Sequence, residues 1–483
     1  ITAKSLTQSG LSVPTSKTYD GTTTATVNGT SALQASETAG TGTTSDGKPY
    51  TGDTVSITGT AAGTYNDAHV ASASSVSFSG LSLTGAQSGN YSLTSYSPAS
   101  ATITAATLTP TISNSSVTKV YDGTTTSTFT PTYTFSGLVS GDTNATLTYT
   151  SRTYNSKDVA SADTVTVSGL SISSITGNKS SATTDYTLDS TSKTKAATIT
   201  AKSLTQSGLS VPASKTYDGT TVATVNGTSA LQASETVGTG TTSDGKPYTG
   251  DTVSITGTAV GTYNDAHVAS ASSVSFSGLS LTGAQSGNYS LTSYSPASAT
   301  ITAATLTPTI SNSSVTKVYD GTTTSTFTPT YTFSGLVSGD TNATLTYTSR
   351  TYNSKDVASA DTVTVSGLSI SSITGNKSSA TTDYTLDSTS KTKAATITAK
   401  SLTQSGLSVP TSKTYDGTTT ATVNGTSALQ ASETAGTGTT SDGKPYTGDT
   451  VSITGTAAGT YNDAHVASAS SVSFSGLSLT GAQ

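Results

Sequence analysis

The residues best suited to chemistry in this chain are few, and most recur at fixed spacing. The motif KxYDGTT occurs with its tyrosine at positions 19, 121, 217, 319 and 415. A tyrosine beside an aspartate can hold a ligand or a metal ion. In the structural interpretation, Asp20 accepts hydrogen bonds from the backbone N–H groups of Thr22 or Thr23, Gly21 forms the turn, and the Tyr19 hydroxyl bonds to backbone.

One copy of this motif in each of several diverged modules favours the structural interpretation, because a binding site would not be needed in every module. We therefore predict a structural turn in each copy, formed by Tyr19, Asp20, Gly21, Tyr121, Asp122, Gly123, Tyr217, Asp218, Gly219, Tyr319, Asp320, Gly321, Tyr415, Asp416 and Gly417.

Histidine occurs three times, always at the same place in the repeat, as His69, His267 and His465. No second histidine and no cysteine accompanies them, although a zinc site needs such partners. A Ser-His-Asp triad needs a positioned base, and one of the two module types has no histidine at all. We interpret these residues as solvated loop histidines, and we predict no catalytic residue and no enzyme activity.

Two other kinds of site stay open. Asp46, Asp53 and Asp67 lie in turn-rich segments, and calcium binds several oxygens from close positions, but no D-x-D-x-D run appears. We predict no cofactor, with calcium as the alternative. Lys17 with an Asn or Asp on a neighbouring strand is a candidate for an intramolecular isopeptide bond. That chemistry requires a buried lysine, an Asn or Asp and a carboxylic acid together, and the sequence does not place them.

The elements that carry these residues belong to a tandem repeat. The string ITAKSLTQSGLSVP begins at Ile1 and starts again at Ile199 and Ile397, so the period is 198 residues. Each period holds two diverged modules, called type A and type B. The predicted domains are 1–102 (A), 103–198 (B), 199–300 (A), 301–396 (B) and 397–483 (A, without the counterpart of the closing strands), which suggests a window on a longer protein.

Apolar residues alternate with polar ones along each module, as in Val55 and Ile57 or Val76 and Phe78. This period of two predicts strands with one buried face. The alternation changes parity at Gly80 and at Gly169, where we predict a β-bulge or a crossover between two sheets. The segment 31–38 is the longest helix candidate, but the corresponding type B segment, 130–138, has the pattern of a strand.

No Gly/Ser- or Pro-rich linker separates the modules, so the last strand of one module runs into the first strand of the next. The predicted fold is all-β, a tandem array of immunoglobulin-like β-sandwich modules forming an elongated rod. At about 3.3 Å per residue, five modules predict a length on the order of 150–200 Å. A β-solenoid is the alternative, but its short period of roughly 20–30 residues is absent.

Composition excludes several classes of function. Lys and Arg number 21 and Asp and Glu 27, which gives a net charge of −6 without any basic cluster, so we expect no nucleic-acid partner. Cysteine is absent, so the chain forms no disulfides. No apolar run approaches the length of a membrane span, and we expect no membrane insertion in this segment.

The motifs KTYDGTT, Gly52-Asp53, GTYND, SGLSLTG, NYSL and ATITA resemble the YDG-type modules of bacterial surface proteins, relatives of the MBG modules of haemagglutinin-like adhesins. The resemblance covers every module, although type B has ITGNKSSATTDYTL where type A has LTGAQSGNYSL. It implies an extracellular location on the bacterial cell surface, many tandem copies, a spacer or adhesive role and no enzyme activity.

Three functions are therefore considered. The first is a stalk that projects an adhesive tip, with a receptor bound through regions outside this sequence. In the second, the modules themselves bind glycan, protein or a surface by many weak contacts, for which Tyr50, Tyr65 and Tyr96 are the candidate contact residues. The third is self-association into extracellular fibres through an open strand edge.

Overall fold

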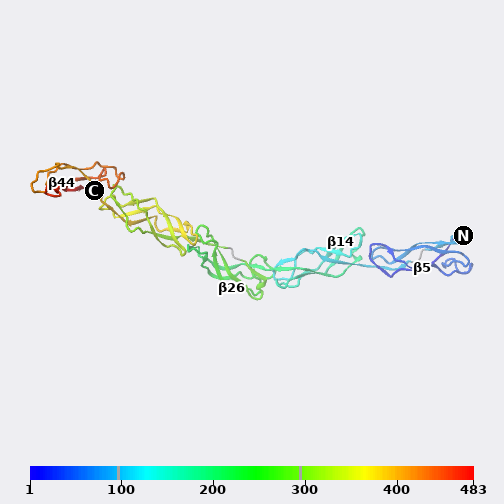
Figure 1. Ribbon diagram of the computed structural model, residues 1–483. Helices are drawn as coiled ribbons and strands as arrows, with labels where there is room; N and C mark the ends of the chain where they lie inside the picture. The colour runs from blue at the N-terminus through cyan, green and yellow to red at the C-terminus, as the bar shows by residue number, and fades with distance from the viewer. Residues whose placement is uncertain (95–97, 293–295) are drawn as a thin grey trace. The chain divides into compact units, whose positions relative to one another are not determined.

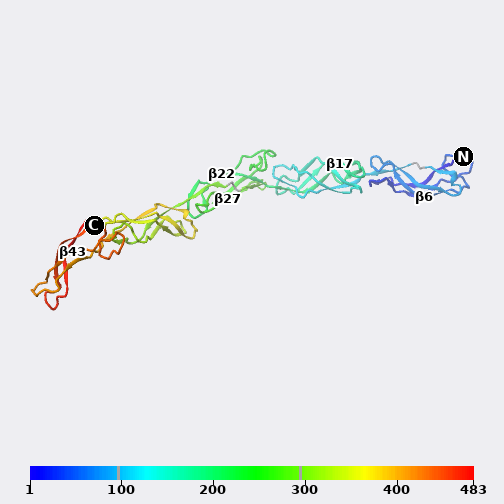
Figure 2. The ribbon, with the colours of Figure 1, turned by 90° about the horizontal axis from the view of Figure 1, so that it is seen from above.

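The computed structural model describes residues 1–94, 98–292 and 296–483, and these residues form strands and loops (Figure 1). Within these ranges no α-helix occurs, which confirms the all-β prediction. The view from above likewise shows strands such as β6, β17 and β27 and no helical coil (Figure 2). The described residues include four single 3-10 turns: η1 Ser88–Asn90, η2 Thr183–Asp185, η3 Ser286–Asn288 and η4 Thr381–Asp383.

The first type A module consists of short strands built from alternating apolar and Ser/Thr residues. Its strands are β1 Lys4–Leu6, β2 Gln8–Ser12, β3 Ser16–Thr18, β4 Thr24–Ala25, β5 Asn28–Leu33, β6 Ser56–Tyr65, β7 Ser75–Thr84, β8 Tyr91–Leu93, β9 Ala99–Ser100 and β10 Thr102–Thr104.

Strand pairing in this module mixes two directions. β1 pairs in parallel with β8, and β3 pairs in parallel with β10. β2 pairs antiparallel with β5, and β4, β6, β7 and β9 form a four-stranded antiparallel sheet. The module therefore consists of several small sheets, including parallel pairs that the sequence did not indicate. A two-sheet immunoglobulin-like sandwich stays a prediction.

The first type B module repeats this plan with a longer opening strand and a longer strand before the closing one. Its strands are β11 Ala106–Ile112, β12 Thr118–Val120, β13 Tyr133–Ser136, β14 Asp142–Thr148, β15 Ser151–Tyr154, β16 Thr164–Ser168, β17 Ser171–Gly177, β18 Tyr186–Leu188, β19 Ser192–Ala196 and β20 Thr198–Thr200. β11 lies between β13 and β18, β12 pairs in parallel with β20, β14 pairs with β17, and β16 lies between β15 and β19.

The later modules follow the same order. β21 to β40 repeat the bounds of β1 to β20 at positions 198 residues further along, from β21 Lys202–Leu204 to β40 Thr396–Thr398. The third type A module contains β41 Gln404–Ser408, β42 Thr420–Ala421, β43 Asn424–Leu429, β44 Val451–Tyr461 and β45 Val472–Gly481.

The two predicted changes of parity have different structural causes. Gly80 adopts a φ of +82° inside β7, and the register with β6 shifts between Gly59 and Ala62, which is a β-bulge. Gly169, with a φ of +67°, lies between β16 and β17, which belong to different sheets. A bulge and a sheet crossover were the two predicted alternatives, and Gly80 shows the first and Gly169 the second. The segment 31–38 forms no helix, since β5 extends to Leu33.

The chain passes from one module to the next without a linker. β10 completes the type A module by pairing with β3, and β11 opens the type B module after one intervening residue, Ala105. The ITA string that begins each module in the sequence therefore supplies the closing strand of the module before it. This arrangement confirms the predicted strand-like junction.

Hydrophobic side chains of neighbouring modules pack in common clusters. One cluster joins Tyr19 and Val76 of the first module to Leu108 and Tyr186 of the second. The next junction has a cluster of the same kind, made of Val117, Tyr121, Tyr154, Ala162, Val165, Ala197, Ile199, Leu204, Tyr248 and Tyr289. Each fully buried side chain of this size contributes about 1.5–3 kcal/mol, so each module stabilises its neighbour.

Contacts divide the chain into two compact units. The first consists of Ile1–Gly208, Ser229–Gly257 and Leu279–Thr292, and the second of Leu209–Thr228, Thr258–Gly278 and Ser293–Gln483. The division falls within the third module and not at a module junction. Each of the four junctions between modules therefore lies inside one unit.

Candidate functional site

The KxYDGTT motif forms a turn held around a lysine. Asp20 Oδ1 accepts the backbone N–H of Thr22 at 2.9 Å, and Gly21 has a φ of +68°. Lys17 Nζ donates to Asp20 Oδ1 at 2.8 Å and to the backbone carbonyls of Thr22 at 2.8 Å and Thr24 at 2.9 Å. The ammonium therefore satisfies carbonyl groups that the turn leaves without a strand partner.

This geometry is present in all five copies, with Lys–Asp distances of 2.6–2.9 Å. Burial acts to raise the pKa of Asp20, but hydrogen bonds from Lys17 and Thr22 outweigh it and hold this pKa below its usual value. In the last copy, hydrogen bonds led by that from Lys413 lower the pKa of Asp416 to about 2. The carboxylate is thus ionised and engaged within the turn.

The motif tyrosine points out of its own module into the next. At the junction from the first type B module to the second type A module, the Tyr121 hydroxyl donates to Asp251 Oδ2 at 2.8 Å. Tyr289 donates to the same oxygen at 2.6 Å, and the two rings meet edge to face with centroids 5.3 Å apart. Burial and the hydrogen bond to Asp251 raise the pKa of Tyr121, which keeps its hydroxyl protonated as a donor.

The junction from type A to type B uses an additional hydroxyl. Tyr19 bonds to Ser181 Oγ at 2.5 Å, and Ser181 donates to Asp142 Oδ2 at 2.6 Å. Tyr186 also donates to Asp142 Oδ2, at 2.6 Å. In both junctions, the motif tyrosine of one module is linked to an aspartate and a tyrosine of the following module. These are Asp142, reached through Ser181, with Tyr186 in the first case, and Asp251 with Tyr289 in the second.

The expectation that the Tyr19 hydroxyl bonds to backbone is therefore wrong, because its partner is a side chain of the following module. Burial of the motif tyrosine depends on that module. Tyr19, Tyr121, Tyr217 and Tyr319 are 0–8% exposed, whereas Tyr415, which no module follows in this sequence, is 59% exposed. The motif is thus both a turn within its module and a contact with the next one.

The histidine of the type A module also reaches across the junction. His69 Nδ1 lies 2.7 Å from Asp185 Oδ2, and the backbone N–H groups of Val70 and Ala182 donate to the same carboxylate at 2.8 and 2.7 Å. Asp185 is fully buried. The interpretation of His69 as a solvated loop residue is wrong, because its partner lies 116 residues further along in the other module type.

His267 and His465 occupy the position of His69 in the later type A modules. His267 makes the same contact with Asp383 at 2.7 Å, so it too is not solvated, whereas His465 is largely exposed and lies beside Asp463. At the junction from the first type B module to the second type A module, Asn288 replaces the carboxylate. Its side chain accepts the Val159 N–H at 2.8 Å and donates to Asp158 at 2.7 Å.

The aspartates considered for calcium face protein donors instead. Asp46 pairs with Lys4 at 3.0 Å, Asp53 accepts the Tyr91 hydroxyl at 2.6 Å, and Asp67 accepts a backbone N–H. In the described part of the chain, no group of three or more His, Cys, Asp or Glu side chains is arranged to hold a metal ion. Lys17 has one carboxylate partner, and its other hydrogen-bond partners are threonine oxygens.

The tyrosines considered as contact residues differ in burial. Tyr65 is 3% exposed, whereas Tyr50 is partly exposed, although its counterparts Tyr248 and Tyr446 are each 2% exposed. Tyr96 lies outside the described residues. The expectation that Tyr65 presents a binding face is therefore wrong, because its ring packs within the core that joins the first two modules.

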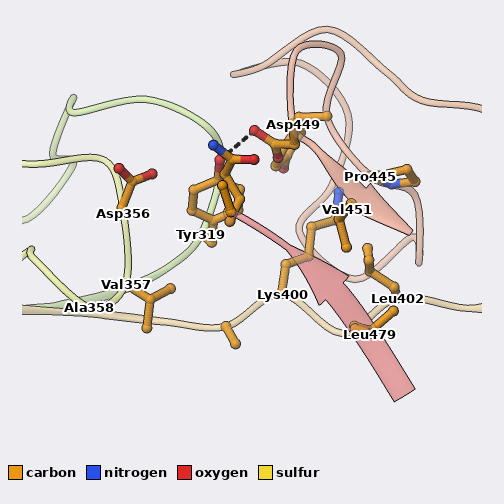
Figure 3. A pocket seen from close by; sticks show the side chains of 14 residues that line it. Tyr319, Asp356, Val357, Ala358, Lys400, Leu402, Pro445, Asp449, Val451 and Leu479 are labelled. Atoms are coloured by element: carbon orange, nitrogen blue, oxygen red, sulfur yellow. Dashed lines mark hydrogen bonds between the residues drawn. The ribbon is translucent and has the colours of Figure 1, made fainter. Parts of the chain in front are cut away.

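A pocket lies where the fourth and fifth modules meet (Figure 3). Tyr319 and Asp449, hydrogen-bonded at 2.8 Å, line it together with Val357 and Leu402. In the preceding junction of the same type, the counterparts of the lining residues Tyr319 and Tyr446 are Tyr121 and Tyr248, which pack in one hydrophobic cluster with Tyr289. The pocket therefore belongs to the packing of a junction and not to a separate ligand site.

Comparison with protein families matches the YDG domain five times, to residues 2–101, 104–194, 200–299, 302–392 and 398–483. The five matches cover nearly the whole chain. A comparison with curated proteins finds no match. In the residues that the structure describes, no helix has the length and apolar character needed to cross a membrane.

Proposed function

The chain belongs to the YDG domain family over its whole length, and we propose from this premise that it is the repetitive stalk of a bacterial surface adhesin. In this role the modules act as passive extracellular spacers, without enzyme activity, that hold an adhesive segment away from the cell. The repetition of nearly identical modules supports the proposal, since length is the property that duplication changes most directly.

The observation that carries the proposal is the shared core at each junction. Tyr121 and Leu204 come from neighbouring modules and pack in the same hydrophobic cluster. Bending at such a junction exposes apolar surface and breaks the hydrogen bond between Tyr121 and Asp251. A spacer benefits from this resistance, because a freely flexing chain of the same length holds its ends much closer together.

Small-angle scattering on the chain and on versions with two and four modules tests the proposal. We expect the maximum dimension to grow in proportion to the number of modules. A matched control inserts a Gly/Ser linker at Ala105, between β10 and β11, and should shorten the maximum dimension. Growth with the square root of the module number in the unmodified chain would contradict a spacer function.

A further inference from the structure

Each type A module contains a buried lysine held by two carboxyl groups. Lys4 Nζ lies 2.6 Å from Glu37 Oε1 and 3.0 Å from Asp46 Oδ1, and the lysine side chain is 7% exposed. The cluster recurs with nearly the same distances in the other two type A modules, as Lys202 with Glu235 and Asp244, and as Lys400 with Glu433 and Asp442.

The surroundings of this lysine exclude water on several sides. The Tyr50 ring lies over Lys4 Nζ with its centroid 4.1 Å away, and the neighbouring Leu6 is fully buried. Lys202 in the second copy is itself fully buried. Removing an ammonium and a carboxylate from water costs free energy. Burial therefore reduces the free-energy difference that favours the ion pair over a neutral amine beside a neutral acid.

The fold does not require this cluster. In the type B module, Ala106 stands at the position of Lys4, since each pairs with the tyrosine of a parallel strand, Tyr186 and Tyr91 respectively. The type B module therefore makes the same strand pair without a lysine. A buried ion cluster kept in three modules and dispensable in the others calls for a role besides packing.

The two carboxyl groups of the cluster lie close together, since both contact Lys4 Nζ and both border Gly42. Burial acts to raise the pKa of Asp46, but hydrogen bonds from Glu37, the Lys48 N–H and Lys4 outweigh it and hold this pKa well below its usual value. The cluster thus combines an amine, a carboxyl carbon within its reach and a second carboxyl group that can carry a proton.

We propose that Lys4 and Asp46 form an intramolecular isopeptide bond, with Glu37 as the proton carrier, and that the equivalent bond forms in each type A module. Lys4 Nζ first passes a proton to the Asp46 carboxylate, which lies 3.0 Å away. The neutral amine attacks Cγ of the protonated Asp46 carboxyl, an N–C bond forms, a C–O bond breaks, and one water leaves with a proton supplied through Glu37. The ammonium and the carboxylate become one neutral amide, so atoms and charge balance without any co-reactant.

Asp46 is the acceptor in preference to Glu37 because of its second hydrogen bond. The backbone N–H of Lys48 donates to Asp46 Oδ1 at 3.1 Å, and a donor at this oxygen stabilises the charge that develops during attack on the carbon. Glu37 contacts both partners and is placed to move the proton. The bond would close a covalent loop from β1 to the turn after β5, a property that does not depend on the spacer role.

Intact-mass spectrometry of the purified, folded chain tests this proposal. The expected mass is lower than that of the sequence by three water molecules, one for each type A module. Tandem mass spectrometry of a digest should then show a branched peptide that joins Lys4 to Asp46. A folded chain with the full sequence mass would overturn the proposal, and a branch at Glu37 would overturn the assignment of the acceptor.

Variants separate this bond from a purely structural ion cluster. Glu37→Gln keeps both partners and should reduce the deficit from three waters to two. Asp46→Asn should give the same final mass as the unmodified chain, because attack on the amide releases ammonia and leaves the same product. Lys17→Met, which removes a lysine with a single carboxylate partner, is the matched control and should leave all three bonds in place.

Discussion

At the scale of single residues, one buried carboxylate connects two modules. Asp185 is fully buried and receives His69 from the preceding module as well as two backbone N–H groups. A buried carboxylate is tolerated only when its oxygens are hydrogen-bonded, so its environment must be complete in the folded array. Because Val70 and His69 belong to another module, Asp185 is satisfied only when the two modules are in contact.

The variant Asp185→Asn should weaken this junction. One oxygen becomes an amide donor that faces the N–H groups of Val70 or Ala182, and we expect a loss of about 1–3 kcal/mol. Hydrogen exchange of the Val70 amide measures the effect. Asp189→Asn, at an exposed Lys193 pair in the same module, is the control and should change exchange little. Unchanged protection at Val70 in Asp185→Asn would show that the contact carries no junction stability.

The KxYDGTT turn should open in acid. In the unfolded chain Asp416 protonates near its ordinary value of about 4, whereas in the folded turn its pKa is about 2. Its contribution to stability is therefore complete above about pH 4 and is lost as the pH falls towards about 2. A pH titration of the Asp416 carboxyl carbon by NMR measures the midpoint.

Lys413→Met removes the main hydrogen bond to Asp416 and should shift that midpoint upward. Lys444→Met, in the same module but without a contact to the turn, should leave it in place. An equal midpoint in the two variants would mean that the lysine does not hold the turn.

At the scale of elements, glycine determines where the long strands form a bulge. A Cβ at Gly80 would meet the Thr60 carbonyl oxygen at 2.4 Å, so both the positive φ and the close backbone approach of the bulge require glycine. In the second type A module, Val274 before the bulge packs in one hydrophobic cluster and Leu281 after it packs against another, within one continuous β27.

Gly80→Ala should therefore cost roughly 1–3 kcal/mol through backbone strain, and more where the carbonyl cannot move. The loss should appear as faster amide exchange in β6 and β7. Gly89→Ala is the matched control, since no atom lies within 4 Å of its added Cβ and its φ is not positive. Similar exchange in the two variants would contradict the requirement for glycine in the bulge.

The sequence predicted these elements well because their causes are local. Alternation of apolar residues identified the strands, and a change of parity located Gly80 and Gly169. The parallel pairing of β1 with β8 was not predicted, because residues 87 positions apart carry no local signal of direction. The cluster of Lys4, Glu37 and Asp46 was missed for the same reason, and Lys17 was considered in its place.

At the scale of the whole molecule, the repeat is built from interdependent modules. The sequence divides at Ile103 or Ile199, but the cores lie across these positions. The partners His69 and Asp185, or Tyr121 and Asp251, belong to different module types and lie 116 and 130 residues apart. Comparison of one module sequence with another cannot reveal such pairs. The sequence therefore predicted that the partners of the motif tyrosine lie in its own module.

The most direct test of this account is a cavity at one junction. Leu204 is fully buried and belongs to the third module, but it packs with Tyr154 of the second. Leu204→Ala should cost about 2–5 kcal/mol, and part of the loss should fall on the second module. Leu209→Ala, five residues further along and outside this core, is the control.

Hydrogen exchange of the Tyr154 amide, which donates to the Thr125 carbonyl at 2.8 Å, gives the result. A shared core predicts faster exchange at Tyr154 in Leu204→Ala and unchanged exchange in Leu209→Ala. Faster exchange confined to the third module, with Tyr154 as protected as before, would contradict the claim that the junctions join neighbouring modules into one structure.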